Sequence, residues 1–84
     1  MYEYQKEREK LFTEDGLKLL LKIRDKVKEL LTEAGAFTME KAISGQGGSS
    51  WMCLACIDYL VEKEEIREVT ALGSCAGQNR IFTA

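Results

Sequence analysis

A single amphipathic pattern in residues 12–35 limits what this chain can fold into. Thr13 stands before two acidic residues, which is the order of a helix N-cap and the positive end of a helix dipole. Gly35 is a helix terminator at the other end. The pattern predicts a core helix at about residues 14–34. At 100° per residue its apolar stripe consists of Leu17, Leu20, Ile23, Val27, Leu30, Leu31 and Ala34.

The charged side of the same predicted helix mixes lysines with acids. Its outward positions hold Lys18, Lys22, Asp25, Lys26, Glu29 and Glu33. A helix face of mixed charge is typical of a surface in contact with water, so we expect these lysines not to form a binding patch.

The chain is short and mildly acidic. It has 84 residues, 45% of them apolar, and a net charge of -2. A chain of this size forms one domain that buries roughly 60% of its unfolded-state surface, which leaves little room for an internal substrate cavity. The negative net charge gives no general attraction to phosphate.

The sequence also bears on the compartment. No stretch has the roughly 18 consecutive apolar residues that a membrane span requires, and the N-terminal segment lacks the apolar core of a signal peptide. Three cysteines, an odd number, do not suit a disulfide framework and fit a reducing compartment. We therefore expect a cytoplasmic protein with no membrane partner.

The remaining signals are shorter. Thr38 is a cap for a second helix, and Ser49 or Ser50 is a cap for a third. Residues 1–12 are mostly charged and are predicted to be an N-terminal arm, in which Phe12 forms a hydrophobic staple with Leu17. Residues 13–84 are predicted to be one domain, with helices at about 14–34, 39–44 and 50–63 and strands at about 66–71 and 80–83.

This order of elements resembles the winged helix-turn-helix superfamily. The residues that carry the resemblance are Thr38 and Ser49 as caps, with Cys53, Ile57, Leu60 and Ile66 at the apolar core spacings. The resemblance implies an α+β fold of three helices and a C-terminal two-stranded β-hairpin wing. The family usually places glycine where Glu64 stands, so this turn must form without the freedom of glycine at positive φ.

In such folds the third helix enters the DNA major groove and the wing contacts the DNA backbone or minor groove. The outward positions of the third helix hold no Arg, Lys, Asn or Gln, the side chains that normally read bases. The first hypothesis is therefore a small nucleic-acid-binding protein, in the role of a transcriptional regulator, that contacts mainly phosphates. Its candidate residues are Lys41, Gln46, Ser49, Ser50, Arg67, Gln78, Asn79 and Arg80.

The second hypothesis is a protein-interaction module. The outward positions of the third helix hold Trp51, Met52, Ala55 and Tyr59. Aromatic and Met side chains are enriched at the centres of protein interfaces. The partner is then a second copy of the chain, another protein, or the chain's own residues 1–12 folded over this face.

Metal binding and catalysis have little support. Cys53 and Cys56 form a C-x-x-C, but three cysteines and no histidine do not supply the four ligands of a structural zinc site. We expect Cys53 and Cys56 in the core and Cys75 as the more reactive thiol. With no histidine and no convergent carboxylates, we expect no enzyme and no cofactor.

Overall fold

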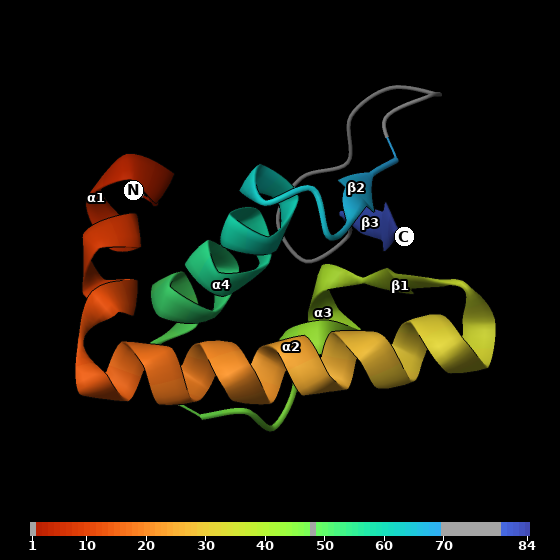
Figure 1. Cartoon of the computed structure of the whole chain (residues 1–84), viewed down its shortest axis with the longest axis horizontal. Helices are drawn as coiled ribbons and strands as arrows, with labels where there is room; N and C mark the ends of the chain where they lie inside the picture. The colour runs from red at the N-terminus through yellow and green to blue at the C-terminus, as the bar shows by residue number, and fades with distance from the viewer. Residues whose placement is uncertain (1, 48, 70–79) are drawn as a thin grey trace.

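The structure is a computed structural model that describes residues 2–47, 49–69 and 80–84. The chain combines helices with a small antiparallel sheet, an α+β arrangement (Figure 1). In chain order the elements are α1 (Tyr4–Arg8), the 3-10 helix η1 (Glu9–Phe12), α2 (Glu14–Ala34), β1 (Ala36–Thr38), α3 (Met39–Ile43), α4 (Ser50–Glu62), β2 (Arg67–Glu68) and β3 (Ile81–Thr83).

Helix α2 forms one edge of the molecule, and the other elements lie to one side of it (Figure 1). Its ends follow the local signals in the sequence. The Thr13 side chain accepts a hydrogen bond from the Gly16 N–H at 3.1 Å, and Gly35 adopts φ 75 at the C-cap. The expected bounds of 14–34 coincide with the observed helix.

The buried side of α2 differs from the predicted stripe. Leu19 is buried although it was not in the stripe, whereas Leu17 and Ala34 are exposed. The Phe12 ring, predicted as the partner of Leu17 in a staple, packs edge-on against Tyr59, with 5.7 Å between centroids. The residues that α2 does bury are Gly16, Leu19, Ile23 and Val27.

The sheet has three strands in the order β1-β3-β2, all antiparallel. Strand β1 was not predicted, because three residues are too few for an alternating pattern. Phe37 pairs with Phe82 across β1 and β3, and their rings stack at 5.4 Å. The strands expected at 66–71 and 80–83 are observed at Arg67–Glu68 and Ile81–Thr83; residues 70–79 lie outside the described part of the chain.

The N-terminal residues, predicted as a charged arm, are helical. In Figure 1, α1 and η1 descend past α4 to the start of α2. Leu11 of η1 is fully buried. A Cβ added at Gly16 would overlap the Lys10 carbonyl oxygen and lie 2.7 Å from the Leu11 Cα. Only glycine therefore allows η1 to approach α2 this closely.

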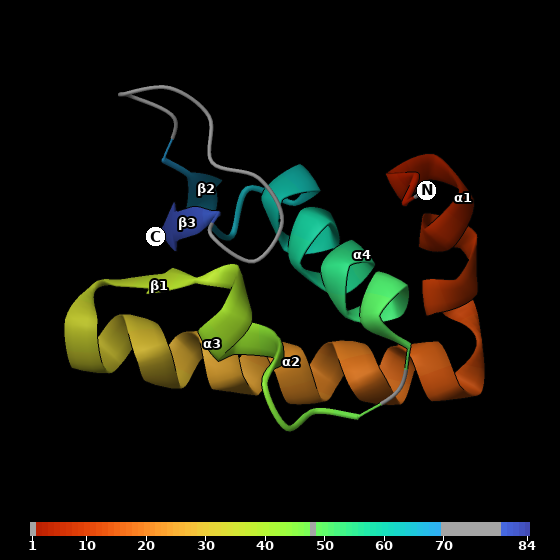
Figure 2. The ribbon, with the colours of Figure 1, turned by 180° about the vertical axis from the view of Figure 1, so that it is seen from behind.

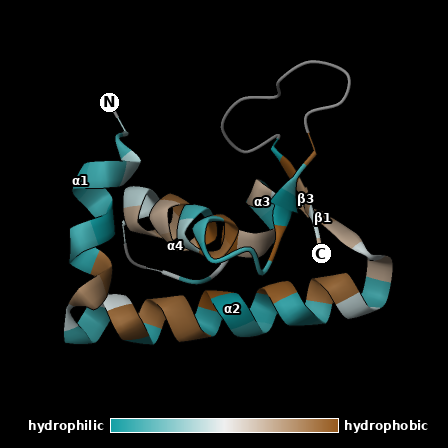
Figure 3. Ribbon diagram, turned by 45° about the horizontal axis from the view of Figure 1, so that its top comes forward, coloured by the Kyte–Doolittle hydropathy of each residue, from teal (hydrophilic) through white to brown (hydrophobic). Residues whose placement is uncertain are grey.

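Helix α4 buries the side that was predicted and a second side as well. Cys53, Cys56, Ile57 and Leu60 are buried as predicted, and Ala55, which was expected to face outward, is fully buried too. The reason is that α1 and η1 pack on a side of α4 that the prediction left open to solvent. Figure 3 shows the contrast, with α1 largely hydrophilic and α4 largely apolar.

The turn after α4 is formed without glycine, as expected. Glu64 adopts φ 60, which is a left-handed conformation and uncommon for a residue with a side chain. Among the described residues, no helix is long and apolar enough to cross a membrane.

Candidate nucleic-acid interface

The structure separates the predicted phosphate contacts into two places. Lys41 and Gln46 lie on α3 and on the turn after it, beside α2. Ser49 and Ser50 are exposed at the start of α4. Arg67 and Arg80 belong to the sheet region instead. Gln78 and Asn79 lie outside the described residues.

Arg80 is an internal cross-link, which corrects the prediction that it contacts phosphate. Its Nη2 donates to Asp58 Oδ1 at 2.7 Å and to Glu68 Oε1 at 2.8 Å, and its Nε donates to Glu68 Oε2. The side chain is only 19% exposed. A guanidinium neutralised by two carboxylates has little charge left for an external phosphate.

The predicted protein-interaction face of α4 is largely covered, and of the three occupants considered for it the structure shows the chain's own N-terminal residues. Ala55 is fully buried, and Met52 and Tyr59 are half-buried. Trp51 is the one residue of this set that is exposed, at 43%. The covering elements are α1 and η1, so the chain's own N-terminal segment occupies the face that a partner would need.

Two tyrosines hold this cover in place. The Tyr2 hydroxyl donates to Asp58 Oδ2 at 2.6 Å, and the Tyr4 hydroxyl donates to Glu62 Oε1 at 2.7 Å. Burial, followed by the hydrogen bond to Asp58, raises the pKa of Tyr2. Burial and the bond to Glu62 raise the pKa of Tyr4 in the same way.

Arg8 completes the contact between α1 and α4. It donates to both carboxylate oxygens of Glu62, at 2.8 and 2.7 Å. The hydrogen bonds from Arg8 and Tyr4 lower the pKa of Glu62 to about 2. The Arg8 guanidinium also lies over the Phe12 and Tyr59 rings. The outer face of α4 therefore carries acidic side chains and is covered by α1 and η1. It does not offer a surface that could contact DNA bases.

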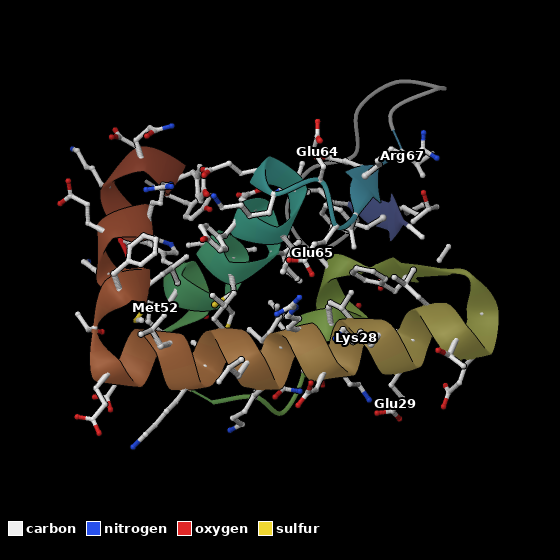
Figure 4. All side chains as sticks on the ribbon, viewed as in Figure 1. Lys28, Glu29, Met52, Glu64, Glu65 and Arg67 are labelled. Carbon is white, nitrogen blue, oxygen red and sulfur yellow. The ribbon has the colours of Figure 1, made fainter. Side chains whose placement is uncertain are left out.

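Two neighbouring grooves run along α2 on another side of the molecule. One, of about 370 Å³, is lined by Lys26, Leu30, Lys41 and Ser44. The other, of about 320 Å³, lies between the first half of α2 and the start of α4; Figure 4 labels Met52 in this region. Its lining residues are Asp15, Lys18, Leu19, Lys22, Gln46 and Met52. In the view from behind, the segment joining α3 to α4 crosses α2 (Figure 2).

We call the cationic residues of these two grooves, Lys18, Lys22, Lys26 and Lys41, the lysine groove. Lys18, Lys22 and Lys26 recur every four residues, which places them in a row about 6 Å apart along the helix axis. Lys22 donates to the Gln46 carbonyl oxygen at 3.2 Å, which ties the row to the turn after α3.

The cations of the chain divide into those with a carboxylate partner and those without one. All twelve lysine and arginine residues and all fourteen acidic residues lie within the described ranges. Six cations have a carboxylate within 4.0 Å: Lys6, Arg8, Lys10, Lys18, Arg24 and Arg80. The other six have no such carboxylate in the part of the chain that the structure describes: Lys28, Lys63 and Arg67 outside the groove, and Lys22, Lys26 and Lys41 side by side within it. Their positive charge is therefore available to an external anion.

Lys22 and Lys26 were not among the candidate residues predicted from the sequence, because acids alternate with them along the chain. The signal that could have found them is geometric: Lys22 and Lys26 lie on the side of α2 that faces Lys41 and Gln46 of the next helix and turn.

The cysteines behave as core residues. Cys53 and Cys56 are buried free thiols, as predicted. Burial raises the pKa of Cys53, and burial raises that of Cys56 to about 12. Within residues 2–47, 49–69 and 80–84, no group of three or more Cys, Asp or Glu side chains is arranged to hold a metal ion. Cys75 lies outside these ranges.

Comparisons with known proteins do not assign this chain to a family. No family model, no curated protein and no solved structure matches this chain.

Proposed function

We propose that this chain is a small winged-helix protein that binds nucleic acid through the phosphate backbone at the lysine groove. The order helix, strand, two helices and two strands, with β3 between β1 and β2, supports the winged-helix assignment. The observation that carries the binding proposal is that Lys22, Lys26 and Lys41 lie together without a carboxylate partner among the described residues.

Phosphate contacts, rather than base contacts, fit the chemistry of this groove. Lysine is a flexible point charge that contacts phosphates without reading sequence. Ser44 and Gln46 add polar groups beside the lysines. Asp58 and Glu62 on α4 are engaged by Arg80, Arg8 and the tyrosines of the N-terminal segment, which covers this side of α4, so α4 is not the element that approaches the nucleic acid.

The alternative function, a protein interaction through the outer face of α4, requires a rearrangement. Residues 2–12 would have to leave Asp58 and Glu62 before Ala55 became accessible. The lysine groove needs no such movement, because it is already open in the folded chain.

Anisotropy of a short labelled DNA duplex, measured across a salt series, tests the proposal. Each phosphate contact contributes about −0.9 to the slope of log K against log salt, so three lysines predict a slope near −3. The double substitution Lys26→Gln with Lys41→Gln is expected to weaken binding and to reduce this slope by about 2.

The matched control is Lys6→Gln with Lys63→Gln, which changes the net charge equally but lies outside the groove. We expect the control to keep the slope of the unmodified protein. Absence of binding at tens of micromolar protein in low salt would contradict the proposal, since even non-specific binders associate there. Equal losses in the two double variants would show that the groove is not the binding surface.

A further inference from the structure

Helix α2 carries an exposed apolar strip on a side that the domain does not use. Leu21 is 58% exposed, the largest value among the described large apolar side chains, and Leu17 is 43% exposed. They are four residues apart and so lie on one face of the helix, one turn apart. Both belong to the edge helix, and in Figure 1 no other element passes in front of it.

Opposite charges stand at equal distances on either side of Leu21. Glu14 precedes Leu21 by seven residues, and Lys28 follows it by seven. Seven residues are nearly two full helical turns, so both side chains lie on the same face as Leu21, about 10 Å from it along the axis. Glu14 is 84% exposed, and its contact with Lys18 is long, at 3.4 Å. Lys28 has no carboxylate partner within the described residues.

We propose that two copies of this chain pair through antiparallel α2 helices, with the two-fold axis at Leu21 and Glu14 of each copy against Lys28 of the other. A two-fold interface brings residue i of one copy against residue j of the other, and j against i. An antiparallel pair centred on Leu21 brings position 14 against position 28 twice, which makes both contacts attractive. A parallel pair would bring Glu14 against Glu14 and Lys28 against Lys28, which is repulsive.

A second copy explains this pattern better than a different partner does. Self-pairing requires that the two ends of one face have opposite charges at equal distances from the centre, and α2 meets that requirement. In this register Leu21 meets Leu21, whereas Leu17 of one copy lies against Asp25 of the other, so the apolar contact is small and the dimer is weak, in the range of transient interfaces.

The pairing leaves Lys22, Lys26 and Lys41 of the lysine groove free, whereas Lys18 lies about 60° from Leu21 and contacts Glu14 of the paired face. Lys22 and Lys26 are rotated from Leu21 by about 100° and 140° around the helix, at 100° per residue. Dimerisation and anion binding therefore use different sides of α2, and either proposal stands if the other fails. In the dimer, each copy presents one lysine groove.

Sedimentation equilibrium of the full chain tests the dimer at concentrations up to about 0.5 mM, which covers the affinities of weak interfaces. The charge exchange Glu14→Lys with Lys28→Glu separates a specific register from general stickiness. Either single substitution creates two like-charge contacts in the dimer, and we expect each to weaken association about tenfold. The double variant restores both attractive contacts with the original composition, so its association constant should return to within about threefold of the starting value.

Leu21→Lys serves as the second probe, since it buries two charges at the axis and should leave only monomer. Leu21 is exposed, so this change spares the core; thermal unfolding followed by circular dichroism checks that each variant folds. A monomer at every concentration would overturn the proposal. So would a double variant that associates no better than the single ones, because the register would then be wrong.

Discussion

Charged side chains have different surroundings in two regions of the molecule. They are paired on the face where α1, α4 and β3 meet, and, among the residues that the structure describes, three of them are unpaired in the lysine groove along α2. On the first, Arg8 and Arg80 each bind carboxylates at 2.7–2.8 Å, and Tyr2 and Tyr4 complete the same network. In the groove, Lys26 has no carboxylate within reach among the described residues. The comparison separates charges that hold the fold together from charges that remain for a ligand.

The largest expected effect comes from Arg80→Met on the paired face. Asp58 and Glu68, whose side chains are 16% and 24% exposed, would lose their shared partner. Asp58 keeps the hydrogen bond from Tyr2, but both carboxylates lose their cation, and removing one partner of an ion pair at such sites costs about 3 kcal/mol of unfolding free energy. Urea denaturation measures this cost. A loss below about 0.5 kcal/mol, the range of ordinary surface changes, would remove the contrast between the two regions.

Gly16→Ala has the next largest expected effect, because it forces η1 away from α2. The new Cβ would overlap the Lys10 carbonyl oxygen and crowd the Leu11 Cα. Overpacking against backbone costs about 2 kcal/mol, and amide hydrogen exchange in residues 4–12 should accelerate. Glu33→Ala, an exposed change on the same helix, serves as the control and should stay within about 0.5 kcal/mol of the starting protein.

A smaller effect is expected from acid on the contact between α1 and α4. The pKa of Glu62 is lowered from 4.5 to about 2, so the charged form is favoured by folding. The stability from its bonds with Arg8 and Tyr4 is fully present above pH 4.5 and is lost as the pH falls through 2. Denaturation midpoints of the starting protein and of Glu62→Gln should differ at pH 7 and converge near pH 2. A difference that does not depend on pH would mean that the carboxylate charge is irrelevant to this contact.

The smallest effect on stability is expected in the lysine groove. Lys26→Gln with Lys41→Gln removes no ion pair present within the described ranges. The unfolding free energy should change by less than about 0.5 kcal/mol, although anion binding weakens. A loss comparable to that of Arg80→Met in the same urea titration would show that these lysines stabilise the fold instead.

Local signals in the sequence were sufficient to predict α2, α3 and α4. Thr13 and Gly35 mark the ends of α2, and Thr38 caps α3 by accepting from the Lys41 N–H. These interactions join residues a few positions apart, so the sequence alone is enough to find them.

The elements that were missed depend on contacts between distant residues. The docking of α1 rests on Tyr2 with Asp58 and Tyr4 with Glu62, more than fifty positions away in the chain. No local pattern indicates that a charged N-terminal stretch will find such partners. The same limit explains Arg80, whose carboxylates on α4 and β2 become its neighbours only when the sheet forms.

The candidate site was predicted in part for a related reason. Lys41 and Gln46 were identified from their position beside the short second helix, whereas Lys22 and Lys26 were discarded because acids alternate with them. Which of two neighbouring charges is neutralised depends on the partners that other elements bring, and a linear sequence does not contain that information.

The strand order β1-β3-β2 has a consequence for how the chain folds. Ala36 pairs with Thr83, so β1 has no strand partner until a loop of more than forty residues closes. Closing long loops is slow compared with forming local helical contacts. The helices α2 and α3 are therefore expected to form early, and the pairing of Phe37 with Phe82 to complete the core late. We therefore expect the pairing of the central strand β3 to be the last step of folding. Variants of β3 should then alter the refolding rate less than the unfolding rate.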